Sequence, residues 1–215
     1  QSVWKEFVHT FALFFNKKGI VATLAFLLFY RFAEAQLVKM VSPFLLDPRG
    51  KGGLGLTTSE VGIVYGTVGV IALLLGGLLG GYFVSKKGLK YWLWIMVFSI
   101  HLPDAMFVYL SQAQPESLWL INAAVGLEQF GYGFGFTAYM LYMISVSEGE
   151  HKTAHYAICT GFMALGMMLP GMFSGDLQEL IGYKNFFLWV IVATVPGFIV
   201  AGLVQVEGEF GKKGS

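Results

Sequence analysis

The stretch SEVGIVYGTVGVIALLLGGLLGGYFV, from Ser59 to Val84, decides the fold class. Its one charged residue, Glu60, lies at the second position. A helix needs about 20 mainly apolar residues to cross a hydrocarbon core that is roughly 30 Å thick. The stretch therefore predicts a membrane-spanning helix.

Five further segments meet the same requirement when proline, glycine and charged clusters are taken as breaks. Together the predicted spans cover residues 20–46, 59–84, 91–110, 118–146, 153–181 and 183–206. The last division is the least marked, because only Gly182 and the polar residues around it separate two apolar runs. We expect an all-α membrane protein whose six transmembrane helices form one bundle over residues 19–206.

The composition excludes several other classes of protein. Hydrophobic residues make up 56% of the 215 residues and charged residues 13%, whereas soluble domains carry about a quarter charged residues. The formal charge of +1 indicates no basic surface for nucleic acid. Cys159 is the single cysteine, so neither a disulfide framework nor a Cys-rich metal site is expected. We expect membrane lipid as a partner, and no nucleic acid, metal or cofactor.

Both ends of the chain are predicted to lie on one side of the membrane. Within residues 1–18, Trp4, Phe7 and Phe11 recur at helical spacing opposite Lys5, which predicts an interfacial helix or a helix that binds a partner. By the positive-inside rule the ends are cytoplasmic, including the tail at 207–215. Nine lysines lie on that side: Lys5, Lys17, Lys18, Lys86, Lys87, Lys90, Lys152, Lys212 and Lys213. Arg49, Lys51 and Lys184 lie opposite.

Ionisable residues inside the predicted spans are the candidate site residues. On insertion scales each costs about 2.5 to 3.5 kcal/mol at a helix centre, so such residues usually face a partner or water. Arg31 and Glu34 are three residues apart, which places them on one face of the first span near mid-depth. Glu128 and Gln129 lie in the fourth span, which also carries Asn122. The candidates for a substrate or proton pathway are Arg31, Glu34, Glu128 and Gln129. Asn122 is a secondary candidate.

Two interpretations of Arg31 and Glu34 stay open. They form a closed ion pair that locks two helices, or they line a polar cavity. In the cavity, Arg31 holds an anionic or sugar-like substrate, and Glu34 or Glu128 exchanges a proton. His101 and Asp104 in the third span are further secondary candidates, as a hydrogen-bonded pair or a proton relay.

No enzyme activity is expected from the motifs. The sequence contains no HExxH motif, no GxSG motif and no His-rich cluster. His151 and His155 have a spacing that could hold a metal, but Lys152 between them favours a solvated surface.

The segment GYFVSKKGLK, from Gly81 to Lys90, follows the second span. It resembles the short basic loop of the major facilitator superfamily, in which a glycine precedes three residues, an acid, a base, any residue, a glycine and further bases. Gly81, Lys86, Gly88 and Lys90 match this pattern. Ser85 replaces the acid, a loss that is common in the second copy of the loop, in the C-terminal half of the fold.

A second set of motifs narrows the resemblance. Glu128-Gln129-Phe130, Pro170-Gly171, Ile181-Gly182-Tyr183 and Val195-Pro196-Gly197 are similar to the C-terminal half of the AmpG-type muropeptide permeases. These permeases are members of the superfamily related to acetyl-coenzyme A transporters. The resemblance implies that the six spans are helices 7 to 12 of a twelve-helix fold and that residues 1–18 belong to the central linker.

The resemblance also implies a function. It implies proton-coupled import of anhydro-muropeptides across the bacterial inner membrane for peptidoglycan recycling. Arg31, Glu34 and Glu128 would line the central cavity, whereas the third span, with His101 and Asp104, would be peripheral. The implied partners are the solute, protons and an N-terminal six-helix half, encoded upstream in the same gene, in another chain or as a second copy of this chain. A different anionic solute such as acetyl-coenzyme A, or a non-transporting membrane sensor or scaffold, are the alternatives.

Overall fold

The computed structural model describes residues 3–214, so Gln1, Ser2 and Ser215 of the expected linker and tail lie outside the described residues. Each element in this range is helical. The α-helices are α1 Val3–Phe15, α2 Ile20–Phe29, α3 Phe32–Leu46, α4 Thr58–Val61, α5 Val70–Lys87, α6 Leu89–His101, α7 Ala105–Ala113, α8 Leu118–Ser147, α9 Lys152–Met172, α10 Ser174–Ala193 and α11 Val195–Leu203. Two 3-10 turns, η1 Arg49–Lys51 and η3 Leu102–Asp104, and a π-helical segment, η2 Gly62–Gly69, connect them.

Four helical stretches among the described residues are long and apolar enough to cross a membrane. They are Ile20–Leu46, Thr58–Lys87, Leu89–Ala113 and Ser174–Leu203. The remaining long helices, α8 with 30 residues and α9 with 21, are less apolar and do not qualify by composition. Length and composition thus identify four of the six expected spans.

Three of these stretches are interrupted rather than continuous. The first breaks at Tyr30 and Arg31, between α2 and α3, although the sequence predicts one helix there. The third breaks at η3, which contains Pro103, and the last breaks at Thr194, before α11. Proline removes a backbone donor and its ring clashes with the preceding turn, which accounts for the break at η3. Gly182 has φ 76° and ψ 164° inside α10, at the expected division between the last two spans.

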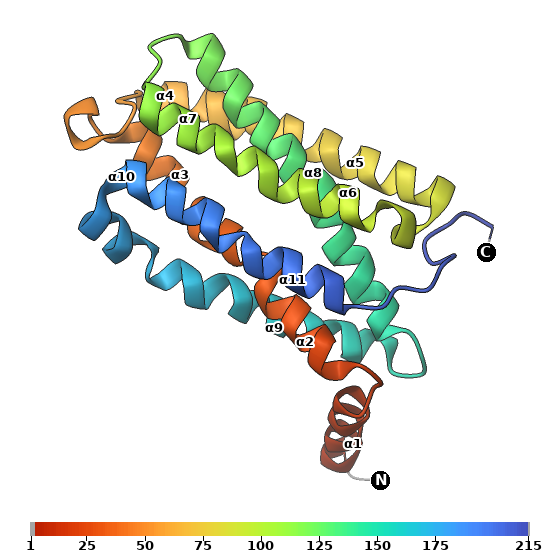
Figure 1. Ribbon diagram of the computed structural model, residues 1–215. Helices are drawn as coiled ribbons and strands as arrows, with labels where there is room; N and C mark the ends of the chain where they lie inside the picture. The colour runs from red at the N-terminus through yellow and green to blue at the C-terminus, as the bar shows by residue number, and fades with distance from the viewer. Residues whose placement is uncertain (1–2, 215) are drawn as a thin grey trace.

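The helices pack side by side, with α8 against α5 and α6, and with α3 against α9 and α10 (Figure 1). Glycines allow the closest of these approaches. A Cβ atom at Gly76 of α5 would overlap the backbone of Phe130 in α8, and one at Gly135 of α8 would overlap α6. Such close backbone contact is what small residues provide in membrane bundles, where lipid is as apolar as the side chains.

Helix α1 lies at the end of the bundle and packs on the beginning of α9 (Figure 1). His155 is 5% exposed, and its Nε2 lies 3.2 Å from the carbonyl oxygen of Thr10. The expectation of a solvated His155 is therefore wrong, because α1 covers it. Trp4, Phe7 and Phe11 remain exposed on α1.

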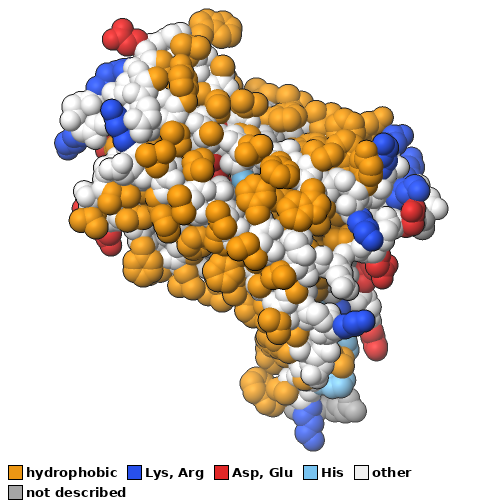
Figure 2. Space-filling model, viewed as in Figure 1, with side chains coloured by type: hydrophobic (Ala, Val, Ile, Leu, Met, Phe, Trp, Pro, Cys, Tyr) orange, Lys and Arg blue, Asp and Glu red, His pale blue; other side chains and the backbone are white. Residues whose placement is uncertain are grey.

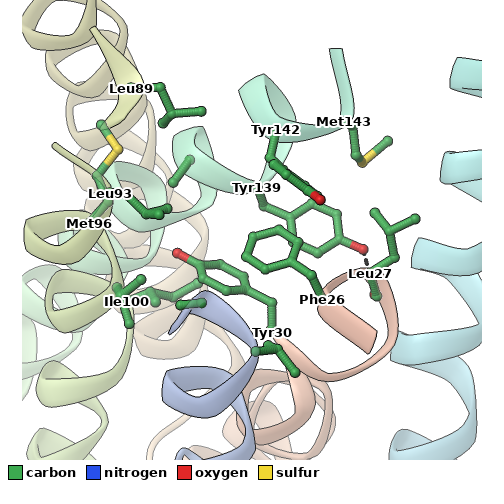
Figure 3. Packing of buried hydrophobic residues seen from close by; sticks show 14 of the residues in the cluster. Phe26, Leu27, Tyr30, Leu89, Leu93, Met96, Ile100, Tyr139, Tyr142 and Met143 are labelled. Carbon is green, nitrogen blue, oxygen red and sulfur yellow. Dashed lines mark hydrogen bonds between the residues drawn. The ribbon is translucent and has the colours of Figure 1, made fainter. Parts of the chain in front are cut away.

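The buried apolar residues form two clusters. The terminal cluster, near the two chain ends, contains Phe26, Tyr30, Ile100, Tyr139 and Val200, and Figure 3 shows its aromatic rings turned toward one another. The distal cluster contains Ala33 of α3, Phe107 of α7, Val125 of α8 and Ala193 of α10, and of these helices α8 also belongs to the terminal cluster.

The polar layer lies between the two clusters and consists of Arg31, Glu34, His101, Asp104, Glu128 and Gln129. Of the helices that carry residues of the layer, α8 contributes apolar residues to both clusters, α6 to the terminal cluster and α3 to the distal cluster. Figure 2 shows apolar side chains over the middle of the visible face and charged side chains at its two ends. The polar layer therefore lies at mid-depth inside an apolar belt.

Candidate functional site

A cavity of about 150 Å³ opens at the polar layer. Helices α3, α5 and α8 and the segment η2 form its wall, with the residues Glu34, Leu37, Val38, Val41, Tyr65, Leu73, Glu128, Gln129 and Tyr132. Water occupies roughly 30 Å³ per molecule in the liquid, so this volume holds a few waters and not a sugar chain. The cavity is one wall of a site rather than a complete enclosure for a large solute.

Glu34 is 1% exposed and lies in the first turn of α3. Its Oε1 lies 2.8 Å from Nδ1 of His101. Of the interpretations left open by the sequence, the closed Arg31–Glu34 ion pair and the hydrogen-bonded His101–Asp104 pair are not found among the described residues, where Glu34 pairs with His101 instead. Residues three apart share a face only in a continuous helix, and the break at Arg31 separates its side chain from that of Glu34.

Arg31 points into a cage of aromatic rings on α8. One terminal nitrogen of its guanidinium donates a hydrogen bond to the hydroxyl of Tyr132. The guanidinium carbon lies 4.4 Å from the centroid of Phe136 and 5.9 Å from that of Tyr139. A cation over an aromatic face is attracted by the negative charge of the ring face. Arg31 therefore adjoins the cavity through Tyr132.

His101 and Asp104 point inward against Glu34, although the resemblance implied a peripheral position for them. They are 2% and 1% exposed. One carboxylate oxygen of Glu34, one carboxylate oxygen of Asp104 and one ring nitrogen of His101 all lie within 4.8 Å of one another. The close packing of α6 on α8 at Gly131 and Gly135 brings the third span into the interior. Among the described residues, both oxygens of Asp104, Oε2 of Glu34 and Nε2 of His101 have no hydrogen-bond partner.

Glu128 and Gln129 form the α8 side of the cavity. The amide nitrogen of Gln129 donates a hydrogen bond of 2.8 Å to Oε2 of Glu128, which is 2% exposed. Asn122 lies outside the cavity lining, and its amide donates to the carbonyl of Leu118 in its own helix.

Tyr65 and Tyr132 are cavity residues that the sequence alone did not single out as candidates. Tyr132 belongs to an aromatic-rich run in α8, and Tyr65 lies among the glycines of η2. Aromatic residues are common in apolar helices, so neither position stands out until the helices are placed together.

The basic loop lies at the end of the bundle, away from the cavity. Helix α5 ends at Lys87, and Gly88 joins it to α6 with φ 80°, a conformation that favours glycine. The carbonyl of Ser85 accepts a hydrogen bond of 2.8 Å from the Lys213 amide, and the Leu89 amide donates one of 2.8 Å to Phe210. The C-terminal tail therefore contacts the loop at Ser85 and Leu89, and Gly88 is buried there, while Gly81, Lys86 and Lys90 are exposed.

The sequence of the chain is similar to those of proteins named as transporters. The chain is 27% identical over 182 residues to "Putative transporter AmpG 1" of Rickettsia prowazekii, covering 84% of this chain and 39% of that protein. It is 26% identical over 193 residues to "Putative transporter AmpG 4" of Rickettsia conorii, covering 90% and 45%. It is 26% identical over 187 residues to "Anhydromuropeptide permease" of Escherichia coli, covering 87% and 37%. No family model matches.

These relatives are named as transporters or permeases and not as enzymes. The chain is AmpG-like in sequence over most of its length, and it spans less than half the length of these relatives. Together with the apolar helices, the similarity indicates a multi-pass membrane protein.

Proposed function

We propose that this chain is the C-terminal half of a proton-coupled permease that imports anhydro-muropeptides across the bacterial inner membrane. The observation that carries the proposal is the similarity to AmpG-type transporters over 84% to 90% of the chain, including a relative named for anhydromuropeptide. The buried polar layer gives this similarity a physical counterpart, because ionisable residues at bilayer depth usually mark a solute or proton pathway.

The architecture belongs to the same proposal. Six spans correspond to helices 7 to 12 of a major facilitator superfamily fold, with α8 and α9 as the fourth and fifth. Helix α8 is less apolar because it carries Asn122, Glu128 and Gln129, and the last two line the cavity, which is a composition suited to a cavity wall. A helix that faces lipid on one side and water on the other has a lower mean hydropathy and still spans the membrane.

An N-terminal six-helix half completes the site. In transporters built from two structural repeats, the solute lies at the interface between the repeats near the bilayer midplane. The cavity at the polar layer lies at that level and is too small for a muropeptide alone. Both ends of the chain are cytoplasmic in this arrangement, with residues 1–18 as the linker on the membrane surface and 207–215 as the tail, as the lysine distribution favours.

The cavity residues have roles that fit a sugar-peptide solute. The hydroxyls of Tyr65 and Tyr132 and the amide of Gln129 supply hydrogen bonds for sugar and amide groups. Arg31 supplies positive charge beside the cavity for a carboxylate of the peptide. Glu34 or Glu128 exchanges the proton.

Uptake into proteoliposomes tests the proposal with the complete protein. Labelled anhydro-muropeptide should accumulate under an inward proton gradient, and an uncoupler should abolish the accumulation. The triple variant Arg31→Ala, Glu34→Gln, Glu128→Gln should lose accumulation, while Asp176→Asn, at an exposed position of α10, should not. Full uptake by the triple variant would reject the residue assignment.

A competition assay separates the solute classes. Acetyl-coenzyme A in excess should leave muropeptide uptake unchanged, and inhibition would favour a different anionic solute. A complete protein that neither takes up muropeptide nor gains thermal stability from it would favour a membrane sensor or scaffold.

A further inference from the structure

Three side chains of the polar layer, Glu34, His101 and Asp104, meet in the buried interior, where their oxygen atoms outnumber the hydrogen-bond donors described there. Each is at most 2% exposed, and they come from α3, α6 and η3. The one hydrogen bond described within the cluster joins Glu34 Oε1 to His101 Nδ1. Glu34 Oε2 and both oxygens of Asp104 remain without a donor.

Two ionised carboxylates cannot share such a site at low cost. Burial of an unpaired carboxylate costs several kcal/mol even after relaxation. Ionised carboxylates only accept hydrogen bonds, so Glu34 and Asp104 cannot bond to each other unless one of them carries a proton. A single added proton would satisfy one oxygen on each residue.

Apart from His101, which is paired with Glu34, the neighbouring groups supply no positive charge to Asp104. Arg31 is the nearest arginine in the layer, and its guanidinium is held by Tyr132 and Phe136. The hydroxyl of Tyr30 donates a hydrogen bond of 2.8 Å to the carbonyl oxygen of Gly135. The charged groups that act on Asp104 are Glu34 and Glu128, and both are acids.

The elements on the remaining side are also uncharged at the cluster. Helix α11 faces His101 with Gly197 and with Phe198, whose ring centroid is 4.9 Å away. At the junction of α10 and α11, the Thr194 hydroxyl donates to Ile191.

The surroundings assign the proton to Asp104 rather than to Glu34. Oε1 of Glu34 lies 2.8 Å from Nδ1 of His101, which is a donor to an ionised Glu34 in the tautomer protonated at Nδ1, and Glu34 lies in the first turn of α3, where backbone N–H groups favour an anion. Asp104 lies at the start of α7, but its side chain makes no capping hydrogen bond. Of the two carboxyl groups, we therefore assign the negative charge to Glu34 and the retained proton to Asp104, which is the weaker acid of the two.

We propose that Glu34, His101 and Asp104 form a buried proton-binding site. In this site Asp104 keeps its proton and donates a hydrogen bond to Glu34. Glu34 also lines the cavity, whereas His101 and Asp104 do not. Glu34 is therefore the residue that contacts both the proton of Asp104 and a solute in the cavity. A solute that binds to Glu34 from the cavity weakens the hydrogen bond between Glu34 and protonated Asp104. This coupling step rests on the proposed transport function, whereas the protonated aspartic acid does not.

Infrared spectroscopy of the complete protein tests for the proton directly. At neutral pH the wild type should show the C=O stretch of a buried, protonated carboxylic acid, and carbon-13 labelling of aspartate should shift it. Asp104→Asn should remove the band, and Asp176→Asn, an identical change at an exposed site, should keep it. A wild-type spectrum without a label-sensitive band would overturn the proposal even if the variant failed to fold.

Transport measurements test the coupling. In proteoliposomes Asp104→Asn should accumulate muropeptide at least tenfold less than the wild type under a proton gradient, and its remaining solute exchange should no longer vary with pH. Wild-type accumulation by the variant would overturn the coupling. If the wild type shows the aspartic acid band but neither binds nor exchanges muropeptide, the transport function fails and the proton site stands.

Discussion

Arg31 and Glu34 are three residues apart, yet their surroundings are of opposite kinds. Arg31 lies among the aromatic rings of Tyr132 and Phe136, which are neutral. Glu34 lies against His101 and Asp104, which titrate. The break between α2 and α3 sends the two side chains to different neighbours.

The difference shows two ways to hold a charge at bilayer depth. Aromatic faces stabilise a cation without adding another charge, so Arg31 keeps its charge under any condition. Titratable partners exchange protons, so the charge of the Glu34 cluster can change with its surroundings. The first environment suits solute binding, and the second suits coupling to protons.

Removing a titratable partner should have the largest effect on stability. His101→Leu leaves the buried carboxylate of Glu34 without its histidine partner, which should lower the free energy of unfolding by about 3 to 5 kcal/mol. Chemical denaturation of the purified protein in detergent measures this loss.

The double variant His101→Leu, Glu34→Met is the matched control. Replacing both members of a buried pair by apolar residues is often neutral, so the double variant should recover most of the stability. A mild single variant, or a double variant less stable than the single, would contradict the assignment of this pair.

Removing Arg31 should cost less, because its partners are neutral. Arg31→Met keeps most of the apolar stem but loses the cation over Phe136 and the donor to Tyr132, which should cost about 2 kcal/mol. The same denaturation experiment compares it with His101→Leu. If Arg31→Met proves the more destabilising, an unpaired charge near Arg31 must have been missed.

Tyr132→Phe should have a smaller effect still. It removes the hydroxyl that accepts from Arg31 but leaves the ring, so the expected loss is about 1 kcal/mol. Thermal unfolding of this variant and of Arg31→Met together with their double variant measures the coupling. Fully additive effects would show that the hydrogen bond contributes nothing.

Asp176→Asn should change stability by no more than about 0.5 kcal/mol, because its side chain is exposed at the beginning of α10. Its unfolding curve sets the baseline for the other variants. A larger loss would indicate a partner that the exposed position does not suggest.

Part of this arrangement follows from the sequence. The predicted span 118–146 differs from α8, Leu118–Ser147, by one residue at its end, because Pro115 and Glu148 mark the apolar run on both sides. The break at Arg31 has no such signal, since neither proline nor glycine is adjacent. Tertiary contacts from α8 decide it.

The candidate site shows the same limit. Glu34, Glu128 and Gln129 stand out because each interrupts an apolar run, and all three line the cavity. Their partners cannot be read from spacing, because His101 lies 67 residues from Glu34 along the chain. Pairing between helices depends on how closely glycines let them approach, and one sequence does not reveal which glycines face which helix.

Gly197 of α11 has a consequence for sequence variation. A Cβ atom there would overlap the imidazole of His101 and lie 2.9 Å from the carbonyl oxygen of Tyr30. A side chain at position 197 would therefore occupy the space that the imidazole of residue 101 fills. Among natural variants we expect the two positions to covary, with a side chain at 197 only where the residue at 101 is smaller than histidine. Variants without histidine at position 101 would also lack this partner of Glu34, so we expect their residue at position 104 to differ as well.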